Sequence, residues 1–108
     1  MICLSPAEAK EDVYVKSIRV NRETIVAVCD AELLGKTLLG GRAPFEVSER
    51  FYKGIPVELD EAIEHVKRAT IVNLVGRRTV DAAILAGLVH PEAVLYFGDV
   101  PHAQIVQL

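Results

Sequence analysis

The chain has 108 residues, of which 51% are hydrophobic, and carries a net charge of −3 from 12 lysines and arginines against 15 aspartates and glutamates. Its length is typical of one domain, and its hydrophobic content supports a buried core, which excludes a wholly disordered chain. The negative net charge excludes a non-specific nucleic-acid binder with a large basic surplus. Every lysine and arginine lies at or before Arg78, so one face built from residues 1–78 can still be basic. We predict one domain over residues 1–108, with residues 1–11 as a loosely ordered extension.

The sequence carries no signal for a membrane or a secretory route. No apolar run reaches the roughly 20 residues that span a bilayer, and residues 1–4 lack the basic start of a signal peptide. Cys3 and Cys29 are far apart and lack the spacing of a redox or zinc motif, so neither a disulfide framework nor a metal site is expected. We therefore predict a cytoplasmic protein with no membrane partner, no metal and no cofactor.

The first half of the chain predicts a β-hairpin, a short helix and an edge strand. Residues 13–20 alternate in polarity and are rich in β-branched side chains, and residues 24–29 are almost wholly apolar, so both are predicted strands. Asp30 is suited to cap a helix over residues 31–39. Residues 44–49 alternate again, which indicates a short strand at an edge of the sheet.

The second half predicts two helices and a second hairpin. Apolar residues at helical spacing after Asp60 predict a long helix over residues 61–75. Thr79 is suited to cap the next helix, residues 80–86, and residues 93–106 contain two strands around a turn. The chain therefore predicts an α+β domain of order ββα-β-αα-ββ, in which an antiparallel or mixed sheet carries helices packed on one side. Parallel βαβ winding is the less favoured arrangement.

Asn73 and the residues just after the long predicted helix form the first candidate site. Asn73 lies within an apolar run, where a buried amide must be hydrogen-bonded, so it either braces neighbouring backbone or faces a pocket. Gly76 can end the helix, and Arg77 and Arg78 then precede the next helix N-terminus, where cations and backbone N–H groups favour an anion. The alternative is that both arginines only stabilise the C-terminal end of the preceding helix.

A second candidate site is the quartet Arg50, Phe51, Tyr52 and Lys53. In nucleic-acid interfaces, aromatic rings stack on bases while neighbouring cations neutralise phosphates. The alternative, which a single short quartet favours, is that the two rings join the core while the two cations are solvated.

His102 follows Pro101 at the start of the last predicted strand, and its imidazole can titrate near neutral pH. It is the candidate acid or base of an enzyme if Cys29 or Asp30 lies within hydrogen-bond distance. A cysteine at a strand end more often serves as a small apolar residue of the core.

The order of these segments is similar to that of a known family. The segments that carry the similarity are residues 28–30, 32–36, 50–54, 69–76 and 98–104. They resemble the archaeal family called domain of unknown function 424, over about residues 12–108. The family has no established activity, substrate or cofactor, so the resemblance implies only an archaeal cytoplasmic protein with an α+β fold. The sequence departs from the family pattern at Asp99, where a glycine is expected.

The polar residues favour a binding module over an enzyme, because they supply donors for an anion or an RNA backbone but no paired carboxylates and no activated nucleophile. The hypothesised partner is RNA or a protein of the translation machinery. Two alternatives stay open: a small-molecule enzyme that uses His102, and a protein-interaction adaptor or homodimer with an exposed apolar patch or strand edge. The candidate ligand-binding residues are Asn73, Gly76, Arg77, Arg78, His102 and Gln104, and the candidate nucleic-acid contacts are Arg50, Phe51, Tyr52 and Lys53.

Overall fold

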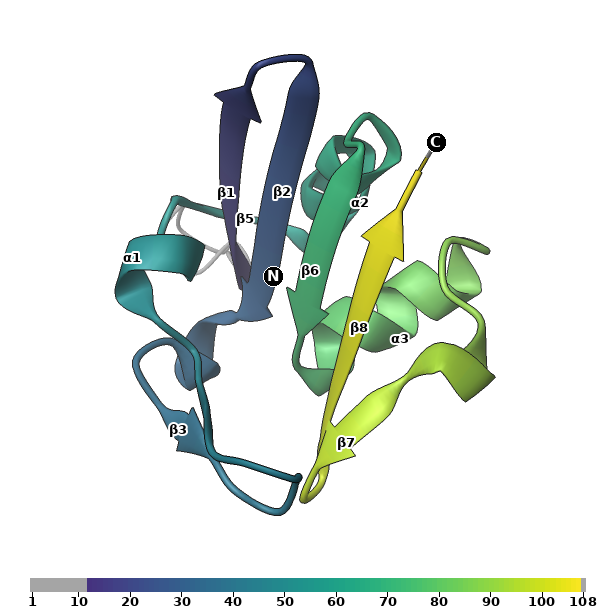
Figure 1. The fold of residues 1–108 in the computed structure, drawn as a ribbon. Coiled ribbons are helices and arrows are strands. Elements are labelled where there is room, and N and C mark those ends of the chain that lie inside the picture. The colour runs from purple at the N-terminus through teal and green to yellow at the C-terminus, as the bar shows by residue number, and fades with distance from the viewer. Residues whose placement is uncertain (1–11, 108) are drawn as a thin grey trace, which may run out of the picture.

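The computed structural model describes residues 12–107, which are built around one six-stranded sheet (Figure 1). The strands lie in the order β5-β1-β2-β6-β8-β7, and β2 and β6 are parallel while the other neighbours are antiparallel. The sheet is mixed, which is one of the two predicted arrangements, and both predicted hairpins, β1–β2 and β7–β8, are confirmed. The strands of this sheet are β1 (Val13–Val20), β2 (Glu23–Asp30), β5 (Ile55–Val57), β6 (Ile71–Val75), β7 (Leu95–Phe97) and β8 (Val100–Val106).

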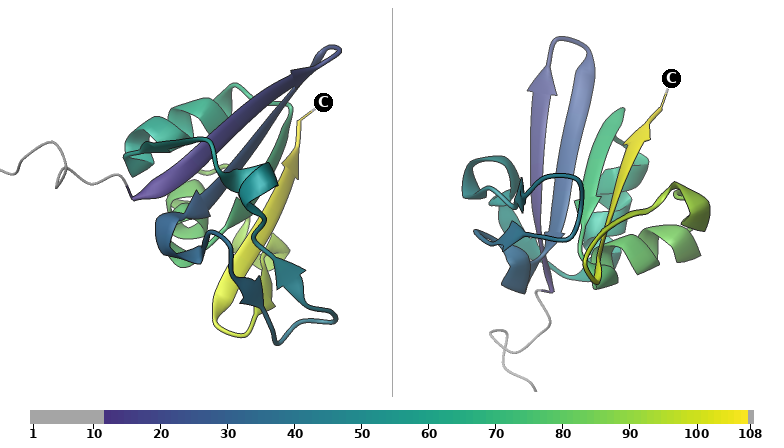
Figure 2. Two further views of the ribbon diagram at one scale, coloured as in Figure 1. Left: turned by 90° about the vertical axis from the view of Figure 1, so that its left-hand side faces the viewer. Right: turned by 60° about the horizontal axis from the view of Figure 1, so that its bottom comes forward.

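Helices cover one face of the sheet, and a mostly irregular segment covers part of the other. α2 and α3 pack on the same face, whereas the segment from η1 to α1, with the small β3–β4 hairpin, lies on the opposite face (Figure 2, left). The α+β class is confirmed, with both longer helices on one side. The remaining elements are η1 (Ala31–Leu33), β3 (Thr37–Leu38), β4 (Phe45–Glu46), α1 (Glu49–Tyr52), α2 (Leu59–Lys67), α3 (Arg77–Leu85) and η2 (Pro91–Ala93).

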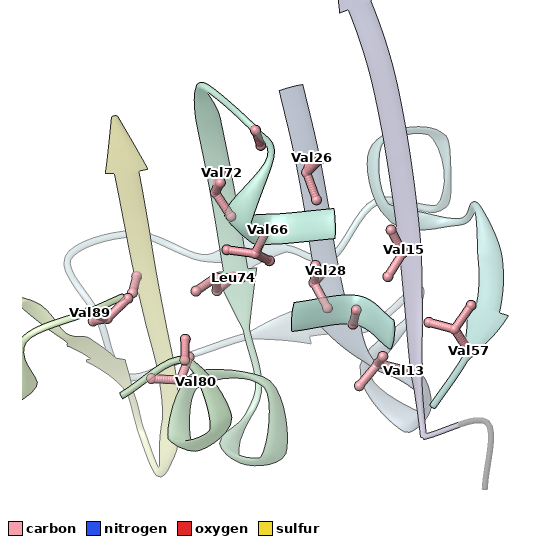
Figure 3. Close-up of a cluster of buried hydrophobic side chains, with 14 residues drawn as sticks. Val13, Val15, Val26, Val28, Val57, Val66, Val72, Leu74, Val80 and Val89 are labelled. Atoms are coloured by element: carbon pink, nitrogen blue, oxygen red, sulfur yellow. The ribbon is translucent and has the colours of Figure 1, made fainter. Parts of the chain in front are cut away.

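The main core lies between the sheet and the two longer helices (Figure 3). A second, smaller cluster lies on the opposite face, where Tyr52 and Val47 cover Ala27, Cys29 and Val75. β2 and β6 are therefore covered on both faces over part of their length, which is why their sequences are apolar nearly all round. The largest wholly buried side chains of the main core are Val13, Val15, Val26, Val28, Val66, Val72, Leu74 and Val80.

The predicted helix over residues 61–75 is wrong in its second half. α2 ends at Lys67, and Ile71–Val75 forms strand β6. This run is rich in β-branched residues that suit a strand covered on both faces, and periodicity alone does not separate such a strand from a buried helix. The resulting pairing of β6 with β2 is parallel, which the expected order of elements had disfavoured.

Two predictions in the first half also change. Only the short turn η1 is helical within the predicted helix 31–39, because Gly35 has a φ of 84° and the chain then enters β3.

The predicted strand 44–49 is limited to β4, and α1 begins at its end. Ser48 caps α1, since its hydroxyl accepts a hydrogen bond from Phe51 N at 3.3 Å.

The predicted helix 80–86 begins earlier than expected. α3 starts at Arg77, and Gly76 rather than Thr79 occupies the capping position. Gly76 has no side chain to act as a cap, and the carboxylate of Asp30, from the end of β2, takes that role. The cap is therefore a contact between distant segments, which a local sequence motif does not reveal.

Pro101 lies inside the sheet, where a missing N–H would normally break the ladder. Gly76 N donates to Pro101 O at 2.9 Å, so these residues face each other across β6 and β8. Gly76 O, which would face an N–H at position 101, instead accepts from Val80 N in the first turn of α3 at 2.9 Å. The proline is tolerated because α3 uses the carbonyl that it leaves free.

The β7–β8 turn shows why Asp99 is compatible with the fold. Gly98 has a positive φ of 63°, and Asp99 does not lie in that region. Only the first central residue of this two-residue turn therefore requires glycine. The departure from the family pattern at Asp99 leaves the turn intact.

Residues 1–11 and 108 lie outside the described residues, and so does the predicted N-terminal extension. The two longest helices of the described part, α2 and α3, have 9 residues each. Within residues 12–107, no helix combines the length and the apolar character needed to cross a membrane.

Candidate functional site

Part of the sheet is uncovered on the face opposite α2 and α3. The segment from η1 to α1 lies over Cys29 and Val75, whereas the far ends of β6 and β8 carry no other element of the described chain above them (Figure 1). In-register side chains from β1, β2, β6 and β8 form two rows at this place. We call this surface the open face; it consists of Lys16, Asn73 and Gln104 in one row and of Ile18, Ile25, Ile71 and Val106 in the next.

Asn73 on β6 and Gln104 on β8 are direct cross-strand neighbours. Along two antiparallel strands, residue pairs that exchange backbone hydrogen bonds alternate with pairs that do not. The hydrogen bond from Gly76 N to Pro101 O shows that these two residues are a hydrogen-bonded pair, and the type of every other pair follows by counting along the strands. This makes Asn73 and Gln104 a non-hydrogen-bonded pair, the type in which side chains approach most closely. None of the side-chain hydrogen bonds within residues 12–107 involves either amide, and Asn73 is half-buried while Gln104 is exposed. Their donors and acceptors are therefore free on the open face.

α1 forms one rim of the open face and carries the predicted aromatic and basic quartet. Tyr52 is buried against Ala27, and burial raises its pKa above the ordinary value. The backbone carbonyl of Arg50 accepts a hydrogen bond from Lys16 Nζ, which ties α1 to β1. Phe51 is 37% exposed and packs edge-to-face on Tyr52 with 5.0 Å between ring centres. Tyr52 thus belongs to the core, while the other three residues of the quartet are exposed.

The N-terminus of α3, the predicted anion site, holds a carboxylate from the chain itself. Asp30 Oδ2 accepts from Arg78 N at 3.0 Å, and Asp30 Oδ1 accepts from Thr79 N at 2.9 Å and from Thr79 Oγ1 at 2.8 Å. Gly76 lies against this carboxylate, because a Cβ there would be 2.3 Å from Asp30 Cγ. The carboxylate satisfies N–H groups of the first helical turn and complements the helix dipole.

Both arginine side chains at this helix are engaged by neighbouring groups. Arg77 Nη2 donates to Asp99 O at 3.0 Å, while Arg78 Nη2 donates to Glu32 Oε1 and to Asp12 O. Burial alone would raise the pKa of Glu32, but the hydrogen bond from Arg78 holds it below its ordinary value. Because α3 packs on the opposite side of the sheet, neither arginine belongs to the open face.

His102 packs among aromatic rings rather than beside a catalytic partner. Its ring centre lies 5.0 Å from that of Phe45 and 6.0 Å from that of Phe97, and burial lowers the imidazole pKa. Cys29 is fully buried, and burial raises the pKa of its thiol to about 12. Val75 lies between Cys29 and His102 in the sheet, so two strand spacings, about 10 Å, separate them. These two side chains therefore do not form an acid–base pair.

The structure divides the six candidate ligand-binding residues among three places. Asn73 and Gln104 share the open face, His102 lies in the aromatic cluster, and the glycine and the arginines lie at the start of α3. Lys16 was not singled out from the sequence, although the alternation of β1 already placed it on the same strand face as Ile18. Within residues 12–107, no cluster of three or more His, Cys, Asp or Glu side chains is arranged to hold a metal ion.

Comparison with solved structures finds a similar fold in the crystal structure of an uncharacterized conserved protein from Methanopyrus kandleri. The TM-score is 0.75 and the sequence identity 25%, over 89% of this chain and 93% of that chain. No curated protein matches the chain. The profile of the family described as "Protein of unknown function (DUF424)" matches residues 18–108 and so confirms the resemblance seen in the sequence. This chain therefore belongs to the DUF424 family.

Proposed function

We infer that this protein is a binding module that holds a segment of single-stranded RNA on the open face. The observation that carries the proposal is the pair of adjacent side-chain amides, Asn73 and Gln104, neither of which takes part in a side-chain hydrogen bond within residues 12–107. Sequence-specific RNA recognition uses unstacked bases whose edges are hydrogen-bonded by protein groups, often across an exposed β-sheet. Asparagine and glutamine amides are suited to base edges because each offers one acceptor and two donors.

The groups around the two amides are the kinds that an RNA strand requires. Lys16 lies in the same row, three strand spacings or about 14 Å from Gln104. Ala27, between Lys16 and Asn73, is buried in the cluster with Tyr52, so the accessible part of this row is the amide pair, with Lys16 at its rim. Lys16 and Arg50 supply positive charge for phosphates at the α1 rim, and Phe51 supplies an exposed ring for stacking. The aliphatic row beside the amides gives apolar contact for base faces.

The charge distribution supports this face over the opposite one. The first two turns of α2, on the other side of the sheet, are acidic and repel phosphates. The α1 rim presents Arg50, Lys53 and Lys16 against one exposed acid of α1, Glu49. Because so few cations take part, the proposal implies modest affinity. If three phosphates are contacted, the logarithm of the binding constant should fall with the logarithm of the salt concentration with a slope of about −2, at roughly 0.7 for each phosphate. The acidic residues of α2 and its start are Glu58, Asp60, Glu61 and Glu64.

Arg77 and Arg78 have a structural role in this proposal: Arg77 donates to the backbone carbonyl of Asp99, and Arg78 donates to the Glu32 carboxylate and to the backbone carbonyl of Asp12. A narrower form of the proposal is that the partner belongs to the translation machinery. This narrower form implies a cytoplasmic protein. The similarity to the Methanopyrus kandleri protein supports an archaeal origin.

The test is fluorescence anisotropy with labelled single-stranded RNA oligomers of about twelve nucleotides, each of one base type, and with an RNA duplex as the competing shape. We expect salt-sensitive binding to at least one single strand. The double variant Asn73→Ala/Gln104→Ala should weaken it at least about tenfold, since each good pair of base contacts contributes about 1–3 kcal/mol.

Two lysine variants, one on each face of the sheet, test which face binds the RNA. Lys16→Ala should weaken binding and make the salt slope shallower by about one phosphate contact. Lys67→Ala, which removes an exposed lysine from α2 on the opposite face, should leave binding unchanged. Absence of binding to every oligomer, or equal binding by the wild type and the double amide variant, would refute the proposal.

A further inference from the structure

The sheet has two edges, and each ends in a strand of three residues, β5 on one side and β7 on the other. The residues of a strand point their N–H and C=O groups alternately to its two sides. Pro101 O is bonded to Gly76 N of β6, so the neighbours Val100 and His102 point their backbone groups toward β7. Their partners in β7 are Phe97 and Leu95. The remaining residue of β7, Tyr96, therefore points its N–H and C=O away from the sheet.

The same reasoning applied to the other edge gives a different result. Ala31 N donates to Asp12 O at 3.0 Å, which sets β1 so that Val13 and Val15 face β5. Pro56, the middle residue of β5, then points outward. A proline at this position has no N–H to offer, which is a common way of protecting an edge from pairing with another chain.

The β7 edge has no such protection. Tyr96 offers both an outward N–H and an outward C=O, and β7 contains neither a proline nor a charged residue. Its side chains are also accessible, since Leu95 is 64% and Tyr96 is 58% exposed. An exposed apolar edge of this kind is a template for an added strand.

A cavity of about 820 Å³ lies next to this edge, between β7 and the loop of residues 40–45. Two close contacts hold the loop in place: a Cβ on Gly40 would be 2.5 Å from Gly98 N, and a Cβ on Gly41 would be 2.5 Å from the Phe97 ring. The walls are mainly apolar, with Pro44, Phe45, Leu95 and Phe97 among them, and Arg42 is the charged residue of the lining. Within residues 12–107, Arg42 forms no ion pair.

We propose that the β7 edge is a strand-addition site for an extended segment of a partner protein, with an apolar side chain in the cavity and a carboxylate at Arg42. The backbone of the segment pairs with Tyr96, and the alternation of strand side chains brings every second residue over the cavity. The site lies at the opposite edge of the sheet from α1 and is independent of the proposed RNA surface, so either can fail alone.

The occupant is a partner segment rather than a second copy of this chain because of charge. A second copy would add its own β7, Leu95–Phe97, which carries no carboxylate; the flanking acids, Glu92 in η2 and Asp99 in the β7–β8 turn, lie outside the strand that would pair. An acidic peptide with alternating apolar residues satisfies both the cavity and the cation. A three-residue edge offers few backbone bonds, so a single segment is expected to bind weakly.

The test is selection from a displayed library of random peptides against the full-length protein. Selected peptides should alternate apolar residues and share an aspartate or glutamate. Methylation of the peptide N–H that faces Tyr96 should weaken binding at least tenfold, because strand addition requires that bond. Arg42→Gln should weaken binding of the acidic peptides and bring it level with that of their amide counterparts.

Two variants of Tyr96 distinguish the contribution of its backbone N–H to peptide binding from that of its side chain. Tyr96→Pro removes the outward N–H and should abolish peptide binding, whereas Tyr96→Ala keeps the N–H and should retain most of it; circular dichroism and thermal unfolding check that both are folded. The proposal is overturned if no peptides are selected, or if the N-methylated peptide or the Tyr96→Pro variant binds as well as its parent. It is also overturned if sedimentation shows that the wild type is a dimer and that Tyr96→Pro dissociates it, because a second copy would then occupy the edge.

Discussion

The carboxylate of Asp30, only 2% exposed, accepts two hydrogen bonds from Thr79, one from its N–H at 2.9 Å and one from its hydroxyl at 2.8 Å. This contact joins the end of β2 to the first turn of α3, across 49 residues of sequence. It also places a negative charge where the dipole of α3 favours one. This buried carboxylate therefore helps to fix the position of α3 against the sheet, together with the core side chains Val80 and Ala83.

Asp30→Asn should lower the free energy of unfolding by about 2–3 kcal/mol, because the new amide places N–H donors against the N–H groups that begin α3. Glu32→Gln is the control, since it removes a neighbouring carboxylate whose pairing with Arg78 is exposed and changes stability by about 1 kcal/mol or less. Urea unfolding of both variants measures the difference. Equal midpoints for the two variants would contradict the role assigned to Asp30.

Gly76→Ala should be more destabilising than Gly87→Ala. Both glycines have positive φ, 112° and 76°, so alanine is strained at either position; the strain is greater at Gly76, whose ψ of 152° places it in a region that essentially only glycine adopts, at a cost of about 1–3 kcal/mol. Only at Gly76 would the added Cβ also meet the Asp30 carboxylate, at 2.3 Å from Cγ, whereas nothing lies within 4 Å at Gly87. We expect the loss at Gly76 to exceed the loss at Gly87 by about 1–3 kcal/mol in thermal or urea unfolding. Similar losses would show that the close approach is unimportant.

Protonation of His102 should destabilise the folded protein as the pH falls. Burial lowers the pKa of His102 below its ordinary value of 6.5, so the unfolded chain binds the proton more readily than the folded one. The stabilisation is fully present above about pH 6.5 and is lost as the pH falls from there toward the folded pKa. His102→Phe should flatten this part of the stability profile, measured by urea unfolding between pH 7.5 and 5.5. An NMR titration that placed the His102 pKa at or above 6.5 would contradict the prediction.

The Cys29 thiol should be unreactive in the folded protein. Its pKa is raised to about 12 by burial, helped by the negative charge of Asp30, so the reactive thiolate is scarce at neutral pH. A Cys3→Ser variant leaves Cys29 as the single thiol. We expect Ellman's reagent to label it at least about a hundredfold more slowly in buffer than in urea. Rapid labelling in buffer would exclude the buried, protonated state.

The local pattern of the sequence was enough to predict the strands of the two hairpins. Alternating and β-branched residues in β1, β2 and β8 favour extended backbone whatever lies beside them. The α+β class and the side-chain alternation that places Lys16 and Ile18 together follow from the same local information.

Only the tertiary structure decided which strands are neighbours and which surfaces are left uncovered. Ile71–Val75 is a strand because β2 and β8 bond to both of its sides, although its sequence also suits a buried helix. The adjacency of Asn73 and Gln104, the capping of α3 by Asp30 and the outward direction of Tyr96 depend on register between segments far apart in the chain. Register is set by pairing and packing across the sheet, so it cannot be predicted from residues that are neighbours in the sequence.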